Sequence, residues 1–258
     1  MYKLRDWIPI SSLNWRDLSA EPRAIRLIEE NPDKIDWAQL SKNPAAIHIL
    51  QRNLSKIHWT YLTENPGAIS LLTKYPDRIN WNHLCRNPEA LHLLNLEYLQ
   101  RTHWEQLSSN PAAIHLLKFR LHKCDWSQLS LNPAAIHLLK LQPKKINWSN
   151  LSLNPAAISL LEKKPEKINW ANLSLNPAAI KLLTDNKDKI CWPYLCKNPA
   201  AIHMIQENLD AIIWEDLSAN PAIFEYDYKA MTRPFTEELM QNRFHPKNIN
   251  RFEVWGFE

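Results

Sequence analysis

The sequence predicts an all-α fold, a solenoid of about ten 22-residue, two-helix repeats with an N-terminal and a C-terminal cap. The first observation is a Trp that recurs every 22 residues, with a single 23-residue step between Trp81 and Trp104. The second is a Pro seven residues after each of these Trp residues, preceded by Asn in every unit except the first, which has Glu21. Units this short bury their apolar faces only by stacking on their neighbours. The repeating residues are Trp15, Trp37, Trp59, Trp81, Trp104, Trp126, Trp148, Trp170, Trp192 and Trp214.

The longer helix of each unit is expected to begin at the Asn-Pro step. Asn is a favoured cap, and Pro at the first helical position loses no hydrogen bond that the helix needs. The segment that follows, of the form AAIxLLK, favours two to three helical turns that end near the next Pro, as at Pro143 and Pro165.

A shorter helix is expected over each WxxLS segment. Its length leaves room for one or two turns, of α or 3₁₀ geometry. Cap residues precede the Trp at Asp36, Asn80, Asp125, Asn147 and Asn169. Gln39, Gln106 and Gln128 stand where the second residue of a capping box would lie.

Neither helix is long enough to be stable alone, so the apolar columns are expected to hold the units together. The expected core columns are the Trp, the Leu three residues later, the Ile ten residues later and the Ile two residues before Trp. Examples are Leu129, Leu151 and Leu173, then Ile136, Ile158 and Ile180, then Ile146 and Ile168. At about 8–10 Å per unit, ten units predict a rod or superhelix of about 80–100 Å.

The ends depart from the repeat. Residues 1–14 are interpreted as an N-terminal cap, residues 15–224 as the solenoid, and residues 225–258 as a C-terminal cap with one helix near Thr236 to Arg243. All three parts are expected to form one continuous domain.

Composition argues against catalysis. Two Gly in 258 residues leave no glycine-rich loop that could cradle a phosphate. The four Cys, at 85, 124, 191 and 196, occupy slots of the repeat and are interpreted as reduced structural thiols. We therefore expect a protein that is not an enzyme, with no cofactor, no bound metal and no small-molecule substrate.

The mild net charge of +4 permits an acidic partner without requiring one. Residues 1–15 hold no apolar signal-peptide core, and no run approaches 18 apolar residues. These features predict an intracellular protein that is not secreted and has no membrane partner.

A basic column lies three residues before Trp and is one candidate site. A row of cations at unit spacing could follow a polyanion such as nucleic acid. The alternative is structural: cations complement the end of the preceding helix and can lie across a Trp ring. The column comprises Lys34, Lys56, Arg78, Arg101, Lys123, Lys145, Lys167 and Lys189, with Ser12 and Ala211 in the end units.

A second column, eleven residues after Trp, is rich in His. Zinc is disfavoured because these residues lie one unit apart and are replaced by Ser, Lys and Arg elsewhere. An exposed face that binds a protein partner is the stronger hypothesis. The candidates are His48, His92, His115, His137 and His203, with Lys118 and Lys140 one turn later.

A third column, two residues after Trp, varies among amides, aromatic and acidic residues, for example Gln128, Asn150 and Tyr194. Such variation resembles the base-reading positions of helical repeats, but the same residues also suit the third position of a capped helix.

The segments LRDWIPISSLNW, WxxLSxNPxAIxLL, NPAIFEYDY and FHPKNI resemble tandem-repeat proteins of giant DNA viruses of amoebae, such as marseilleviruses and mimiviruses. The resemblance implies a viral protein that acts inside an infected host cell. We accordingly expect a non-enzymatic scaffold that engages a host or viral protein, with nucleic-acid binding through the basic column as the alternative.

Overall fold

The computed structural model describes residues 2–94, 99–230 and 232, and they form an all-α solenoid of 22-residue units. Units are counted from their Trp, so unit one begins at Trp15 and unit ten at Trp214. The α-helices are α1 (Trp15–Ala20), α2 (Ile25–Glu30), α3 (Trp37–Leu40), α4 (Ile47–Arg52), α5 (Trp59–Glu64), α6 (Ile69–Lys74), α7 (Trp81–Leu84), α8 (Arg101–Ser108), α9 (Ile114–Leu117), α10 (Trp126–Leu131), α11 (Ile136–Leu141), α12 (Trp148–Leu153), α13 (Ile158–Leu161), α14 (Trp170–Leu175), α15 (Ile180–Thr184), α16 (Trp192–Cys196), α17 (Ile202–Gln206) and α18 (Trp214–Leu217). Two short strands, β1 (Tyr2–Leu4) and β2 (Phe224–Tyr226), pair antiparallel.

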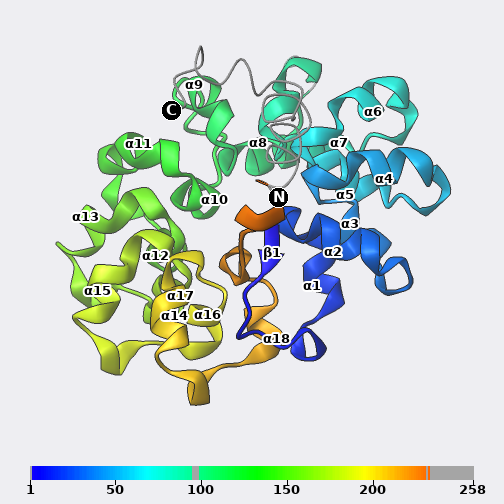
Figure 1. Cartoon of the computed structure of the whole chain (residues 1–258). Helices are drawn as coiled ribbons and strands as arrows, with labels where there is room; N and C mark the ends of the chain where they lie inside the picture. Colours follow the sequence, from blue (N-terminus) through cyan, green and yellow to red (C-terminus); the bar gives the residue numbers. More distant parts are fainter. Residues whose placement is uncertain (1, 95–98, 231, 233–258) are drawn as a thin grey trace, which may run out of the picture.

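The units wind into a ring (Figure 1). The helices that carry the repeated Trp lie toward its centre, and the second helices, such as α4, α6, α11 and α13, lie at its circumference. We call these the inner and the outer helices. The chain passes from α1 over α8 to α18, which lies beside α1 again.

The two-helix unit is confirmed, but the 3₁₀ geometry lies elsewhere than expected. The inner helix is α-helical. A 3₁₀ turn instead begins at the Asn-Pro step, as at Pro133–Ala135, and runs directly into the outer α-helix. A second 3₁₀ turn, such as Pro143–Lys145, then leads to the next Trp. In unit four the outer element is the 3₁₀ helix Pro88–Leu93.

The predicted helix caps are confirmed. Each Asn six residues after Trp accepts a hydrogen bond from the N–H two residues later, and Glu21 does the same in unit one. Asp36, Asn80, Asp125, Asn147 and Asn169 each accept from the N–H three residues later.

The capping boxes expected at Gln39, Gln106 and Gln128 are wrong. A capping box needs the N–H of the cap residue, and in units two and six this N–H donates to a serine of the preceding unit. In unit five, α8 begins three residues before Trp104, so Gln106 lies inside that helix.

The core prediction is correct for the Leu column and only partly correct for the Trp and Ile columns. Leu129, Leu151 and Leu173 are fully buried, whereas Trp126, Trp148 and Trp170 are half-buried and pack on the edge of the core, as do the predicted Ile columns. Along the Trp column exposure ranges from 2% at Trp104 to 47% at Trp81. A Trp at the first residue of a helix projects from the helix end, so only part of its ring reaches the space between the layers.

The remaining core consists of columns with small or polar side chains. A Ser, Thr or Cys four residues after Trp, the Asn six after, an Ala nine after and a Leu or Ile thirteen after are buried in nearly every unit. Ser130, Asn132, Ala135 and Leu139 represent them in unit six. The small Ala lets the outer layer lie close to the inner one.

Buried asparagines link each unit to the one before it. Asn154 donates both hydrogens of its side-chain amide, to the backbone oxygens of Ser130 at 3.0 Å and Asn132 at 3.1 Å, while its Oδ1 accepts from Ala156 N–H. The backbone oxygen of Asn154 in turn accepts from Asn176. The same bonds, which we call the asparagine ladder, are formed by Asn43, Asn65, Asn87, Asn110, Asn132, Asn154, Asn176, Asn198 and Asn220.

A buried hydroxyl supplies a second link. Ser130 donates to the carbonyl of Trp126 and accepts from the N–H of Asn147 in the next unit at 3.1 Å. The equivalent bond recurs from Asp36, His58, Asn80, Asp125, Asn169 and Cys191.

This second link also closes the ring. The N–H of Asn14, directly before Trp15, donates to Ser218 Oγ of unit ten at 2.8 Å. Unit one therefore stacks on unit ten through the bond that joins consecutive units elsewhere. The solenoid is confirmed, but the rod or superhelix of about 80–100 Å expected from the sequence is wrong, because the last unit returns to the first.

The N-terminal residues complete unit ten. After the 3₁₀ turn Pro221–Ile223 the chain enters β2 instead of an outer helix. The missing connection is supplied by the 3₁₀ turn Ile10–Ser12, which occupies the slot of Pro143–Lys145, and by buried Leu13 in the slot of Ile146. Trp7 packs on Trp214 with ring centroids 6.4 Å apart. Residues 1–14 are thus the second half of unit ten.

Side chains of unit one and the N-terminal segment strengthen this junction. Arg5 donates to the carbonyl of Ala222, and Arg23 donates to the carbonyl of Pro221. Arg5 and Lys3 also form ion pairs with Glu225 on β2. The helix expected near Thr236 to Arg243 lies outside the described residues.

Replacing Asn154 with Ala tests the asparagine ladder. The change removes two donors to buried carbonyls and one helix cap, so we expect the free energy of unfolding to fall by about 3–5 kcal/mol in urea denaturation. The exposed Gln142→Ala is the control and should change it by less than about 0.5 kcal/mol. Equal effects of the two variants would refute a stabilising role for the ladder.

Candidate interaction surfaces

The surface of each inner helix that faces away from the core carries the side chains that vary most between units. Leu129 and Ser130 point into the core, so helical geometry places the residues one, two and five after Trp on the opposite side. In unit six these are Ser127, Gln128 and Leu131. We call this surface of the ring the inner face.

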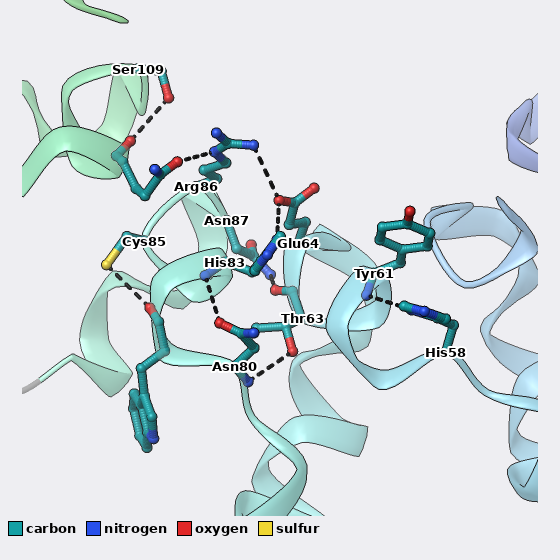
Figure 2. A network of polar contacts seen from close by, with 12 residues as sticks. His58, Tyr61, Thr63, Glu64, Asn80, His83, Cys85, Arg86, Asn87 and Ser109 are labelled. Carbon is teal, nitrogen blue, oxygen red and sulfur yellow. Dashed lines mark hydrogen bonds and ion pairs between the residues drawn. The ribbon is translucent and has the colours of Figure 1, made fainter. Parts of the chain in front are cut away.

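Neighbouring units are coupled across part of the inner face (Figure 2). His83 Nδ1 lies 2.6 Å from Glu64 Oε1, and Arg86 reaches the same carboxylate as well as Gln106 of the next unit. In the Glu64–His83 and Arg86–Gln106 pairs, the residue five after Trp meets the residue two after the following Trp. Lys42 over the Tyr61 ring, and Lys197 with Asp216 at 2.7 Å, repeat this arrangement. A hydrogen bond from Lys197 to Asp216 raises the pKa of Lys197.

Most residues of the third sequence column contact a neighbouring unit, as His83, Gln106 and Asp216 do. Asn150 donates to the backbone and hydroxyl oxygens of Ser127, and Asn172 donates to the same atoms of Ser149. These amides serve unit-to-unit contacts, which accounts for their residue type without a base-reading role.

Three consecutive units place leucine on the inner face. Leu131, Leu153 and Leu175, each five residues after Trp, are half-buried and do not belong to the packed core. Other units have Lys42, Glu64, Arg86, Ser109 or Lys197 at this position. We call the three residues the leucine stripe. Sequence reasoning missed it, although a position that tolerates Lys and Glu elsewhere cannot require Leu for stacking.

The basic column lies over the Trp column. The ammonium groups of Lys34, Lys56, Lys123, Lys145 and Lys189 lie 4.4–5.3 Å from the ring centroid of the Trp of their own unit. Arg78 and Lys167 are exposed, and the side chain of Arg101 lies outside the described part of the structure. On unit ten, where Ser12 fills this slot, Trp7 takes the place of the lysine.

The His column lies on the exposed side of the outer helices. His48, His92, His115, His137 and His203 are exposed, as are Lys118 and Lys140. His48 Nε2 lies 2.8 Å from Glu29, and His115 Nδ1 lies 2.9 Å from the backbone oxygen of Ala112. Across the described residues no three His, Cys, Asp or Glu side chains gather as a metal site.

The cysteines are free thiols. Burial raises the pKa of Cys85 to about 11 and also raises the pKa values of Cys124 and Cys196, so these thiols stay protonated near neutral pH. Cys85 donates to the carbonyl of Trp81, as a serine does in other units.

A cavity of about 610 Å³ lies at the junction of units five and six, lined by Trp104, His122, Lys123 and Asp125 among others. Asp125 caps α10, and Lys123 lies over Trp104. Both groups thus have structural partners.

Comparison with protein-family models, with curated proteins and with solved structures found no match. Within the described residues no helix is long and apolar enough to span a membrane.

The Trp column is expected to contribute less to stability than the Leu column beside it. Leu151→Ala removes a fully buried side chain and should cost about 2–5 kcal/mol of unfolding free energy. Trp148→Ala removes a half-buried ring at the edge of the core and should cost about 2 kcal/mol. Urea denaturation of both variants decides this, and a larger loss for Trp148→Ala would contradict the packing described here.

Proposed function

We propose that the chain is a non-enzymatic scaffold that binds an extended segment of a partner protein along the leucine stripe. The observation that carries this proposal is the repetition of half-buried Leu131, Leu153 and Leu175 at one position in three consecutive units. Apolar side chains in register on a rigid solenoid are typical of peptide-binding surfaces.

The distance between neighbouring units of the leucine stripe indicates the conformation of the segment that it would bind. Units about 8–10 Å apart match apolar residues at every third position of a polyproline II segment, which rises about 3.1 Å per residue and returns to the same face every three residues. The hydroxyls of Ser127 and Ser149 and the amide of Asn172 beside the stripe are held in unit-to-unit hydrogen bonds, so the apolar contacts of the leucine stripe would supply most of the binding. Polar coupling at Glu64, His83 and Arg86 covers the inner face in other units and so favours units six to eight.

The resemblance of the repeats to giant-virus proteins supports a partner of viral or host origin, met inside an infected cell. The alternative, nucleic acid bound through the basic column, has weaker support because five of its lysines already lie on Trp rings.

A displayed random-peptide library selected on the immobilised protein tests the proposal. We expect enriched peptides with apolar residues three apart. Replacing Leu131, Leu153 and Leu175 together with Asn should weaken their affinity at least about tenfold in titration calorimetry. The control variant replaces His92, His115 and His137 with Asn on the outer helices and should bind as the wild type does.

Peptides that bind both variants equally, or that need the His column instead, would refute binding on the inner face. Thermal unfolding of each variant shows that the ring is intact. A gel shift at about 50 mM salt addresses the alternative, because phosphate contacts strengthen steeply at low salt. Tight binding of single-stranded DNA or RNA with no enriched peptide would favour nucleic acid over a protein partner.

A further inference from the structure

The positive charge of the chain is concentrated in one part of the ring. Residues 118–167 contain nine Lys and Arg against three Asp and Glu, a net charge of +6. Because the whole chain carries +4, all other residues together carry −2. Every one of these nine cations is exposed except Arg120, which is half-buried.

The nine cations share one edge of the ring. They lie at the C-terminal ends of α9, α11 and α13 and in the turns that lead from these outer helices to the next Trp. We call the Lys and Arg residues of 118–167 the basic rim. The same edge is acidic or mixed elsewhere, with Glu29, Glu30 and Asp33 in unit one and Glu207 and Asp210 in unit nine.

Two large apolar side chains project from the basic rim. Phe119 is 74% exposed and Leu141 is 66% exposed. They occupy the same position, fifteen residues after Trp, in neighbouring units. Arg52, Lys74, Lys163, Asp185 and Glu207 fill this position elsewhere, so the fold does not require an apolar residue there.

Some cations of the basic rim lie over aromatic rings, and others have no partner among the residues that the structure describes. Arg120 and Lys123 flank Trp104, Lys145 lies over Trp126, and Lys118 lies over Phe119. Lys140, Lys144, Lys163, Lys164 and Lys167 are exposed, and none of them forms an ion pair with another described residue. These five are available to an anionic partner.

We propose that the basic rim docks on an anionic lipid bilayer. Phe119 and Leu141 would enter the interfacial region, while the lysines would contact headgroup phosphates. Apolar insertion and electrostatic attraction are each weak alone, and stable peripheral binding needs both. The expectation of no membrane partner rested on the lack of a spanning segment, and surface docking needs none.

Leu141 favours a bilayer over a nucleic acid. Single-stranded nucleic acid gains binding energy by stacking bases on aromatic rings, and an aliphatic side chain has no ring to offer. Transfer into hydrocarbon stabilises Phe and Leu alike. A side chain that lined a peptide groove would also be more covered than 66–74% exposed.

Cosedimentation with vesicles of phosphatidylcholine and phosphatidylserine, at about 0.1 M salt, tests the proposal. The wild type should bind vesicles with 30% phosphatidylserine and not pure phosphatidylcholine, where 30% is roughly a physiological anionic fraction. Phe119→Ser with Leu141→Ser keeps every charge and should lower the partition coefficient about tenfold or more. Leu209→Ser, at a 55% exposed apolar residue in acidic unit nine, is the control and should have no effect.

A second pair of variants distinguishes binding through the basic rim from a general effect of the protein's net charge. Replacing Lys144, Lys163 and Lys164 with Glu should lower the partition coefficient by roughly a hundredfold or more, because each lysine near an anionic surface contributes separately. Replacing exposed Arg52, Lys74 and Lys181 with Glu changes the net charge equally and should retain most binding.

The proposal is overturned if the wild type does not bind the anionic vesicles or if both triple variants lose binding equally. It is also overturned if the Ser variant binds as the wild type does. A surface that prefers single-stranded DNA to vesicles in competition would be a nucleic-acid site instead. Melting curves of all variants should overlap, because every substituted side chain is exposed.

Discussion

Each buried asparagine of the Asn-Pro turns forms three hydrogen bonds that connect two units, and the rest of the ring depends on this arrangement. With Oδ1 it caps the 3₁₀ turn of its own unit, and with its two amide hydrogens it satisfies backbone carbonyls at the end of the preceding inner helix. Its own carbonyl accepts from the next asparagine. A buried amide with every donor used fixes the relative orientation of units more strictly than apolar contact could. The leucine and alanine columns bury apolar surface, and the hydrogen bonds of the asparagine and serine columns fix how each unit is oriented on the next.

Closure follows because one small rotation is repeated at every step. Nine joints with the same bonds bring unit ten beside unit one, and Asn14 then meets Ser218 as Asn147 meets Ser130. The last unit is split between the two ends of the repeat region. Glu21 lies at this joint in the slot of the asparagine, and a carboxylate cannot donate the two ladder bonds. Arg5 and Arg23 instead supply donors to carbonyls of unit ten. Side chains on the inner face and on the outer helices are not needed for stacking and can vary separately. The leucine stripe lies on the inner face, and the basic rim lies at the ends of the outer helices.

Features that depend on a few neighbouring residues, such as helix caps, could be predicted from the sequence. Features that depend on how several units are arranged in space, such as ring closure, could not. The caps at Asp125 and Asn154 and the burial of Leu151 depend on a few neighbouring residues. The half-burial of Trp148 depends on where a helix end lies relative to two layers, which hydrophobicity alone does not indicate. The link made by Ser130 was hidden because a serine in a repeat looks like a surface residue. Closure had a signal in Leu13 and Asn14, which occupy the slots of Ile146 and Asn147 before the first Trp. In the sequence, the leucine stripe and Phe119 were visible only as departures from the repeat. Whether such an apolar residue belongs to the core or to a binding surface depends on its solvent exposure, which the sequence does not give.

An engineered disulfide across the β1–β2 strand pair tests whether the ring is closed and its tenth unit is split between the two ends of the repeat region. Lys3 and Glu225 are opposite one another in the β1–β2 register, so the double variant Lys3→Cys with Glu225→Cys should oxidise rapidly within one molecule. We predict a monomeric species whose peptide map shows a disulfide between the two substituted positions, with unchanged circular dichroism. An open solenoid of about 80–100 Å would hold these positions far apart. If the two substituted cysteines formed disulfides between molecules, or stayed as free thiols after oxidation, the ring would not be closed in solution.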